Sequence, residues 1–231
     1  MALTMRTTQG VGRHQGVKSL VFGGAGAGKT TLMATALSYN PIILSAESGL
    51  LSLSNYNIPF FDINTIADFE EAYKWLAFSQ ESLQFGLVGC DSISEIAEVL
   101  LAKLKASVKD PRQAYGDVVT DCVALLRKLR DLPGRNVLVT AKMEYIKGEG
   151  LALPKYQPSM PGSKLGAALP YLFDEVFYLG ISQPDAQGKT FRYLQTCATM
   201  DKDCKDRSGL LAAYEAPDMG YILNKILGYT Q

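Results

Sequence analysis

Residues 23–30 read GGAGAGKT and match the spacing G-x-x-x-x-G-K-[ST] at every fixed position. The glycines let the backbone curl so that several N–H groups point inward at an anion. Lysine at 29 would reach β- and γ-phosphates as a point charge, and the hydroxyl at 30 would bind Mg²⁺, with the hydroxyl at 31 as the weaker alternative. The motif predicts a site for ATP and Mg²⁺, whose phosphates would be held by Gly23, Gly24, Ala25, Gly26, Ala27, Gly28, Lys29, Thr30 and Thr31.

Two carboxylates end apolar segments further along the chain. Asp91 ends QFGLVGCD, where it could hold Mg²⁺ through water, cap the following helix, or do both. Glu47 ends PIILSAE. Because ligands bind at the carboxyl ends of parallel strands, we expect Glu47 in the same crevice as Gly28 and Asp91. There it could orient and deprotonate an attacking water; the alternative is a solvated glutamate in a turn.

Strands and helices must bring these residues together. Apolar segments at 17–23, 41–47, 84–91 and 135–142 are typical of buried strands, with a further short strand at 59–64. Helices are indicated at 29–39, 67–78, 93–107, 116–132 and 218–228. The segments 174–182 and 189–197 alternate and flank PDAQG, which predicts a hairpin. The pattern favours an α/β fold with a doubly wound, mostly parallel sheet and a C-terminal antiparallel hairpin.

The stretch 143–164 is rich in glycine and proline and has no clear regular pattern, so it is predicted to be a long functional or mobile loop. The chain has 231 residues, which fits one domain at 17–231 preceded by a flexible arm at 1–16. The sequence has neither a signal peptide nor an apolar run of membrane length, and we expect a cytoplasmic protein without membrane contact. The four cysteines lack CxxC spacing and there is one histidine, so a zinc site is not predicted.

The succession of a phosphate loop, a strand ending in Ala-Glu and a strand ending in Asp-Ser resembles the core of RecA-like recombinases. The compact length, with LVTAK (138–142), MPGSKLGAALP (160–170), FDEVFYL (173–179) and CKDRSGLL (204–211), is similar to short phage nucleotide-binding proteins of that superfamily. Some of these act as ATP-linked single-strand annealing proteins. The resemblance spans about residues 17–212, and only the phosphate loop is specific in isolation.

The resemblance implies a RecA-like P-loop NTPase core that uses ATP and Mg²⁺ in the host cytoplasm. It also implies single-stranded DNA as a partner, a homo-oligomeric ring or filament, and a single-strand-binding protein as a further partner. Carried over by position, Gly28, Lys29 and Thr30 match the phosphate and Mg²⁺ residues. Asp91 matches the Walker-B carboxylate, and Glu47 matches the water-activating glutamate.

Three cations have less settled roles. Lys142 stands where this superfamily often has a glutamine or histidine that senses the γ-phosphate, so a lysine there is a departure; it would contact phosphate or be a surface cation. Lys205 and Arg207 match a basic element that in RecA-like filaments can reach the ATP of the neighbouring subunit. The alternative is a solvated charge cluster formed with Asp201, Asp203 and Asp206.

Single-stranded DNA would be expected at the 143–164 stretch, because lysines can track phosphates while tyrosine rings stack on bases. The residues concerned are Lys147, Lys155 and Lys164 with Tyr145 and Tyr156. A second candidate is the turn with Lys105, Lys109, Arg112 and Tyr115. Both signals are weak because such residues are common on surfaces, and the net charge of zero removes the simplest argument for nucleic-acid binding.

Three functions are weighed on this basis. The first is a DNA-dependent ATPase that anneals or pairs strands. The second is a nucleotide-controlled switch that binds a protein partner with little turnover. The third, a P-loop kinase for a small molecule, is less favoured, because its candidate lid contains lysines and prolines but no arginine between Arg135 and Arg192.

Overall fold

The computed structural model describes residue 8 and residues 15–47, 49–148, 153–162 and 164–229; most of the predicted arm at 1–16 lies outside this set. The strands are β1 (Lys18–Gly23), β2 (Pro41–Ser45), β3 (Phe60–Asp62), β4 (Leu87–Asp91), β5 (Asn136–Ile146), β6 (Lys155–Pro158), β7 (Glu175–Ile181), β8 (Arg192–Gln195), β9 (Lys205–Asp206) and β10 (Tyr214–Glu215). The α-helices are α2 (Ile66–Phe78), α3 (Ile93–Ser107), α4 (Pro111–Arg130), α5 (Leu165–Ala168) and α6 (Met219–Leu227). The 3₁₀ helices are η1 (Thr30–Tyr39), η2 (Leu50–Leu53), η3 (Glu81–Gln84) and η4 (Leu169–Leu172).

The described strands form one sheet in the order β10-β8-β7-β1-β5-β4-β2-β3, with β6 paired to β5 and β9 paired to β7. The strands from β7 to β3 in this order run parallel, whereas β8 and β10 extend the sheet in antiparallel fashion. This confirms the predicted fold: a RecA-like P-loop NTPase core with a mostly parallel sheet and a C-terminal antiparallel hairpin. The carboxyl ends of β1, β5, β4 and β2 therefore meet at one edge of the sheet.

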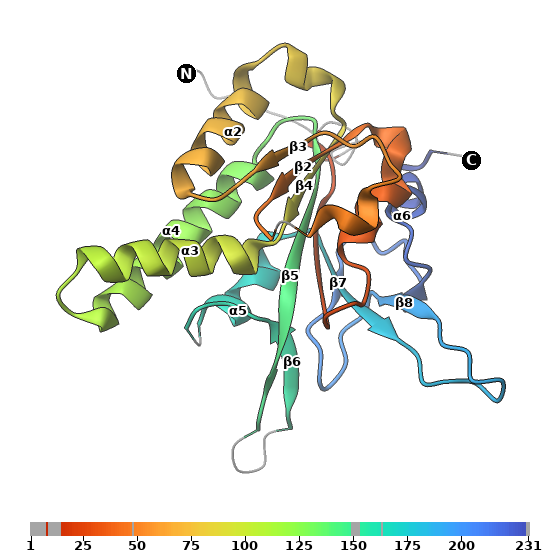
Figure 1. The fold of residues 1–231 in the computed structure, drawn as a ribbon. Helices are drawn as coiled ribbons and strands as arrows, with labels where there is room; N and C mark the ends of the chain where they lie inside the picture. Colours follow the sequence, from red (N-terminus) through yellow and green to blue (C-terminus); the bar gives the residue numbers. More distant parts are fainter. Residues whose placement is uncertain (1–7, 9–14, 48, 149–152, 163, 230–231) are drawn as a thin grey trace.

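Helices cover both faces of the sheet (Figure 1). One face packs against apolar side chains of α2, α3, α4 and α5, and the other against those of η1, η2 and α6. Parallel strands that are covered on both sides need apolar residues at almost every position, which explains why β1, β2 and β4 are buried along their whole length.

Polar side chains set the starts of the long helices. Thr65 and Asp68 form a reciprocal capping box at α2, and Ser92 caps α3. Helix α4 begins at Pro111 rather than at the predicted Gly116, because the side chain of Asp110 accepts a hydrogen bond from the N–H of Arg112 at 2.9 Å. A proline in the first turn suits this start, since its missing N–H has no partner there in any case.

The prediction of an irregular stretch at 143–164 is wrong over its two arms. Strand β5 continues to Ile146 and pairs antiparallel with β6, so that Tyr145 lies opposite Tyr156 and Ile146 opposite Lys155. The two tyrosine ring centroids are 5.3 Å apart. Cross-strand aromatic pairing stabilises such a hairpin, but the neighbouring glycines and prolines hide its short alternating arms in the sequence. The short elements α5, β9 and β10 were also not predicted.

A buried acid lies at the start of β7. Glu175 is 1% exposed, and its Oε1 accepts a hydrogen bond from the N–H of Ser208 at 3.2 Å. Burial raises the pKa of Glu175 to about 8, and the negative charge of Asp206 acts in the same direction. Asp206 lies directly opposite Glu175 in the β7–β9 pair.

The raised pKa predicts how stability depends on pH. Between an ordinary glutamate pKa of 4.5 and about 8, the folded protein keeps a proton that the unfolded chain releases. Stability should therefore fall as the pH rises through this window. Glu175→Gln should show a shallower fall in Tm from pH 5 to pH 8 and a Tm a few degrees above wild type at pH 8. The exposed Glu71→Gln is the matched control, and identical pH profiles for Glu175→Gln and wild type would refute this account.

Candidate active site

The phosphate loop follows β1 directly and leads into η1. Gly26 and Gly28 have φ values of +72° and +105°, which side chains rarely adopt. A Cβ at Gly23 would lie 2.5 Å from the carbonyl oxygen of Leu179, so the close approach of β7 also requires glycine there. The loop borders a cavity of about 600 Å³, and all the predicted phosphate residues from Ala25 to Thr31 line it. This volume lies within the ordinary range for small-molecule sites.

Lys29 is folded back onto its own loop. Its Nζ donates to the carbonyl oxygens of Gly23 at 2.9 Å and Gly24 at 3.0 Å. Burial lowers the pKa of Lys29, while the carboxylates of Glu47 and Asp91 act in the opposite direction. The ammonium group is thus already held beside the position where phosphate oxygens would replace the two carbonyls.

Asp91 connects three elements at the end of β4 and is only 3% exposed. Its Oδ2 accepts a hydrogen bond from Thr30 Oγ1 at 2.6 Å, and its Oδ1 accepts one from Thr140 Oγ1 in β5. A hydroxyl and a carboxylate in direct contact are oxygen donors of the kind that Mg²⁺ takes in nucleotide sites. The side chains of Thr30 and Asp91 therefore fit the predicted metal position.

Glu47 lies two residues beyond β2, which ends at Ser45 rather than at the predicted residue 47. Its side chain lines the cavity together with Lys29 and Thr30. Ser92 Oγ donates a hydrogen bond to Glu47 Oε1 and also accepts the N–H of Glu95 at 3.4 Å. Ser92 rather than Asp91 is therefore the cap of α3, which leaves the Asp91 carboxylate to its two threonines. The peptide bond between Asp91 and Ser92 is cis.

Comparison with known proteins places this site in a family. The model of the AAA domain family matches residues 15–208. The chain belongs to the AAA domain family. Together with the complete phosphate loop, this makes it a P-loop ATPase domain, and the family implies a nucleotide with Mg²⁺ as its ligands.

Among solved structures, a KaiC-like protein from the hyperthermophilic archaeon Pyrococcus horikoshii aligns with a TM-score of 0.44 and 16% sequence identity. The alignment covers 78% of this chain and 77% of that chain. No curated protein matches the chain. No helix in the described ranges is both long enough and apolar enough to cross a membrane.

Lys142 of this AAA domain lies level with Gly23 in the β1–β5 register, at the phosphate edge of the sheet. Its Nζ is 2.5 Å from Glu95 Oε2, and this hydrogen bond raises the pKa of Lys142. Its positive charge in turn contributes to the lowered pKa of Lys29. Lys142 is therefore close enough to influence the phosphate site while its ammonium group is paired with an acid, and both roles considered for it stay open.

Lys205 and Arg207 lie at the opposite edge of the sheet. Strand β9 pairs with the start of β7, which in turn lies beside the start of β1. Lys205 Nζ donates to the carbonyl oxygens of Pro170 at 2.7 Å and Phe173 at 2.5 Å, and burial lowers its pKa. Neither residue reaches the phosphate loop of its own chain, so their predicted contact with ATP would need a second subunit.

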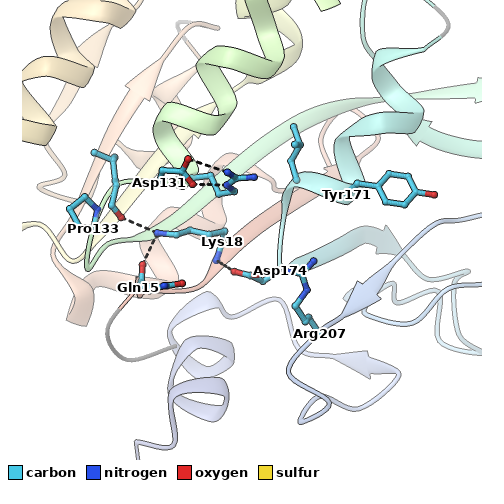
Figure 2. A pocket seen from close by; sticks show the side chains of 11 residues that line it. Gln15, Lys18, Asp131, Pro133, Tyr171, Asp174 and Arg207 are labelled. Atoms are coloured by element: carbon cyan, nitrogen blue, oxygen red, sulfur yellow. Dashed lines mark hydrogen bonds and ion pairs between the residues drawn. The ribbon is translucent and has the colours of Figure 1, made fainter. Parts of the chain in front are cut away.

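Arg207 borders a second cavity of about 410 Å³ at this far edge. Its Nη1 is 2.8 Å from Asp174 Oδ1, and Asp174 Oδ2 accepts the backbone N–H of Lys18 at 3.2 Å (Figure 2). Lys18 Nζ donates to the carbonyl oxygen of Gln15 at 2.8 Å, and burial lowers the pKa of Lys18 to about 8. The cations around this cavity are therefore engaged by acids and carbonyl groups of the same chain.

The predicted DNA residues fall on separate parts of the fold. Lys147, Lys155 and Tyr156 belong to the β5–β6 hairpin, where Lys155 pairs with Asp203 at 3.2 Å. Lys164 precedes α5 and is exposed. The second candidate lies at the α3–α4 turn with Lys109 and Arg112, which projects in another direction from the hairpin (Figure 1). The two candidate surfaces are not continuous.

Sequence reasoning missed three residues of the site. Ser92 was weighed only as a helix cap, and Thr140 was taken as part of an apolar strand, although a hydroxyl in LVTAK was a signal. Arg192 in β8 donates from Nε to the carbonyl oxygen of Ala27 at 2.9 Å and lines the cavity. It lies 165 positions from Ala27 in the sequence, so no local pattern could indicate it.

Thr140→Val should weaken Mg²⁺ binding by about tenfold or more, because residues that hydrogen-bond a metal-binding carboxylate typically contribute this much to affinity. Valine has nearly the same shape, so the packing of β5 should be kept. The measurement is a Mg²⁺ titration followed by a fluorescent ATP analogue. Thr196→Val is the matched control, because Thr196 is equally buried but bonds the carbonyl of Ala212 away from the site. Equal Mg²⁺ affinity in both variants would exclude a supporting role for Thr140.

Proposed function

We propose that this AAA domain hydrolyses ATP with Mg²⁺ in the cytoplasm and couples hydrolysis to single-stranded DNA, in strand annealing or pairing of the kind found in phage recombination. One observation carries the hydrolytic part. Lys29, Thr30 and Glu47 line a single cavity, and Asp91 lies directly behind Thr30. A loop that only captured a nucleotide would not require an acid at the position of Glu47.

Each residue has a task that its present contacts prepare. Lys29 would exchange the carbonyls of Gly23 and Gly24 for phosphate oxygens, while Thr30 and Asp91 would hold Mg²⁺. The metal, when bound, neutralises charge on the phosphates. Glu47 would exchange the hydroxyl of Ser92 for a water molecule and accept its proton as the water oxygen bonds to the γ-phosphorus.

The course of β5 supports a coupling between this site and DNA. The strand carries Lys142 at the phosphate edge and continues to Ile146, where the β5–β6 hairpin begins. A shift of Lys142 from Glu95 towards a γ-phosphate would move the strand that supports Lys147. Lys147 and Lys155, with the stacked Tyr145 and Tyr156, supply the cations and rings that single strands bind. Phosphates would have to replace Asp203 as the partner of Lys155.

The position of Lys205 and Arg207 supports a homo-oligomer. Both lie at the sheet edge opposite the phosphate loop, so they could approach ATP only in a head-to-tail assembly of subunits. Repeated head-to-tail contacts produce a ring when they close and a filament when they do not. A single-strand-binding protein as a further partner rests on the resemblance alone.

Glu47→Gln should lower the ATP turnover rate by about 100-fold or more, because it removes the proton acceptor and keeps the side-chain shape. Affinity for ATP should stay within about twofold, since the phosphate contacts of Lys29 and Thr30 remain. Phosphate release and equilibrium nucleotide binding measure the two effects, with Glu98→Gln on α3 as the control. If wild type turns over no faster than Glu47→Gln, the nucleotide-controlled protein-binding switch becomes the better account.

The DNA part is tested by fluorescence anisotropy of a labelled single strand with a non-hydrolysable ATP analogue. Lys147→Ala combined with Lys155→Ala should weaken binding and reduce its salt dependence by about two phosphate contacts. Lys109→Ala combined with Arg112→Ala is the matched pair from the second candidate surface and should have little effect. The DNA role fails if wild type neither binds the strand nor shows ATPase stimulation by it.

A further inference from the structure

The cavity at the phosphate loop has two chemically different flanks, which follow from the strand order. Strands β4 and β2 lie on one side of β1, and the residues after them supply Asp91 and Glu47. Strands β7 and β8 lie on the other side, and they supply Leu179 and Arg192 to the same cavity. The acidic flank is therefore separated by the loop itself from an apolar flank with one cation.

The direction of a bound nucleotide follows from these flanks. The proposed metal and the water-activating acid both act at the γ-phosphate, so the terminal phosphate must face the flank of Asp91 and Glu47. The nucleoside then extends the other way, towards Leu179 and Arg192. Thr35 and Pro217 line this part of the cavity as well.

Close backbone contacts hold this flank in place. The N–H of Met219 donates to Thr35 Oγ1 at 2.8 Å, and a Cβ at Gly220 would lie 2.6 Å from the carbonyl oxygen of Thr35. The start of α6 is therefore fixed against η1, and Pro217 with it. On the other side, Leu179 is held by the close approach of its carbonyl to Gly23.

Arg192 is anchored to the phosphate loop but not used up by it. Its Nε donates to Ala27, and a Cβ at Gly28 would lie 3.4 Å from the same nitrogen, so the guanidinium group lies directly against the loop. One hydrogen bond fixes the direction of the group, while its planar face remains a surface on which an aromatic ring can stack. The residue is exposed, as an open slot requires.

We propose that Leu179, Arg192 and Pro217 form the slot for the base of the nucleotide, with the Arg192 guanidinium stacked on the ring. An aromatic ring fits between two apolar side chains and a planar cation, whereas a phosphate gains nothing from Leu179 or Pro217. Purines should bind more tightly than pyrimidines, because the larger ring covers more of the guanidinium group. The inference rests on the proposed nucleotide site and adds which residues hold the base.

The test compares equilibrium binding of ATP with that of inorganic tripolyphosphate, which has the phosphates but no base. Arg192→Ala should weaken ATP binding by about tenfold and leave tripolyphosphate binding unchanged, because only the ring loses its partner. Arg192→Lys should recover only part of the loss, since an ammonium group has no planar face. Lys189→Ala, an exposed cation on the same β7–β8 connection, is the matched control and should behave as wild type.

The outcomes separate the slot from the site as a whole. Equal losses for ATP and tripolyphosphate in Arg192→Ala would overturn the proposal, because Arg192 would then act on the phosphates or on the loop. An unchanged ATP affinity would overturn it as well, while hydrolysis through Glu47 would stand. If wild type bound neither ligand, both the slot and the proposed function would be wrong.

Discussion

The arrangement of the site depends on the buried carboxylate of Asp91. One of its oxygens accepts the hydroxyl of Thr30 at the start of η1, and the other accepts Thr140 in β5. A charge that is 3% exposed at the centre of a sheet must be fully partnered, because an unpartnered carboxylate there is costly. The two threonines satisfy it, and in doing so they fix the phosphate loop against two strands. Any group that binds the loop is thereby placed at a set distance from Asp91.

The strand order converts this local contact into a directional site. Because β5 lies between β1 and β4, both acids reach the loop from one side, while β7 and β8 border it from the other. Glu47 and Lys142 each have a partner in the first turn region of α3, namely Ser92 and Glu95. The start of α3 thus holds two of the groups that would act on a γ-phosphate, which makes it the natural element to respond when phosphate binds.

Much of the core could be predicted from local sequence. The phosphate loop is a contiguous motif, and Glu47 and Asp91 follow apolar segments whose parallel arrangement sends their ends to one edge. The rest depends on contacts between distant segments. Arg192 reaches Ala27 across 165 positions, and Lys142 could not be known to pair with Glu95 before the packing of α3 was known. The β5–β6 hairpin was missed because its pairing, not its glycine- and proline-rich composition, makes it regular. Likewise, only the sheet register shows that Lys205 and Arg207 lie at the edge opposite the loop.

The central claim is that one cavity combines a metal position at Thr30 and Asp91 with an acid, Glu47, that acts on water. A crystal structure with Mg²⁺ and a non-hydrolysable ATP analogue tests it most directly. The account predicts the metal about 2.0–2.1 Å from the hydroxyl of Thr30. It also predicts that Asp91 lies beside the metal and that the carboxylate of Glu47 leaves Ser92 to face the γ-phosphate. A metal bound away from Thr30 and Asp91, or a Glu47 that stays on Ser92 with the γ-phosphate out of reach, would contradict it.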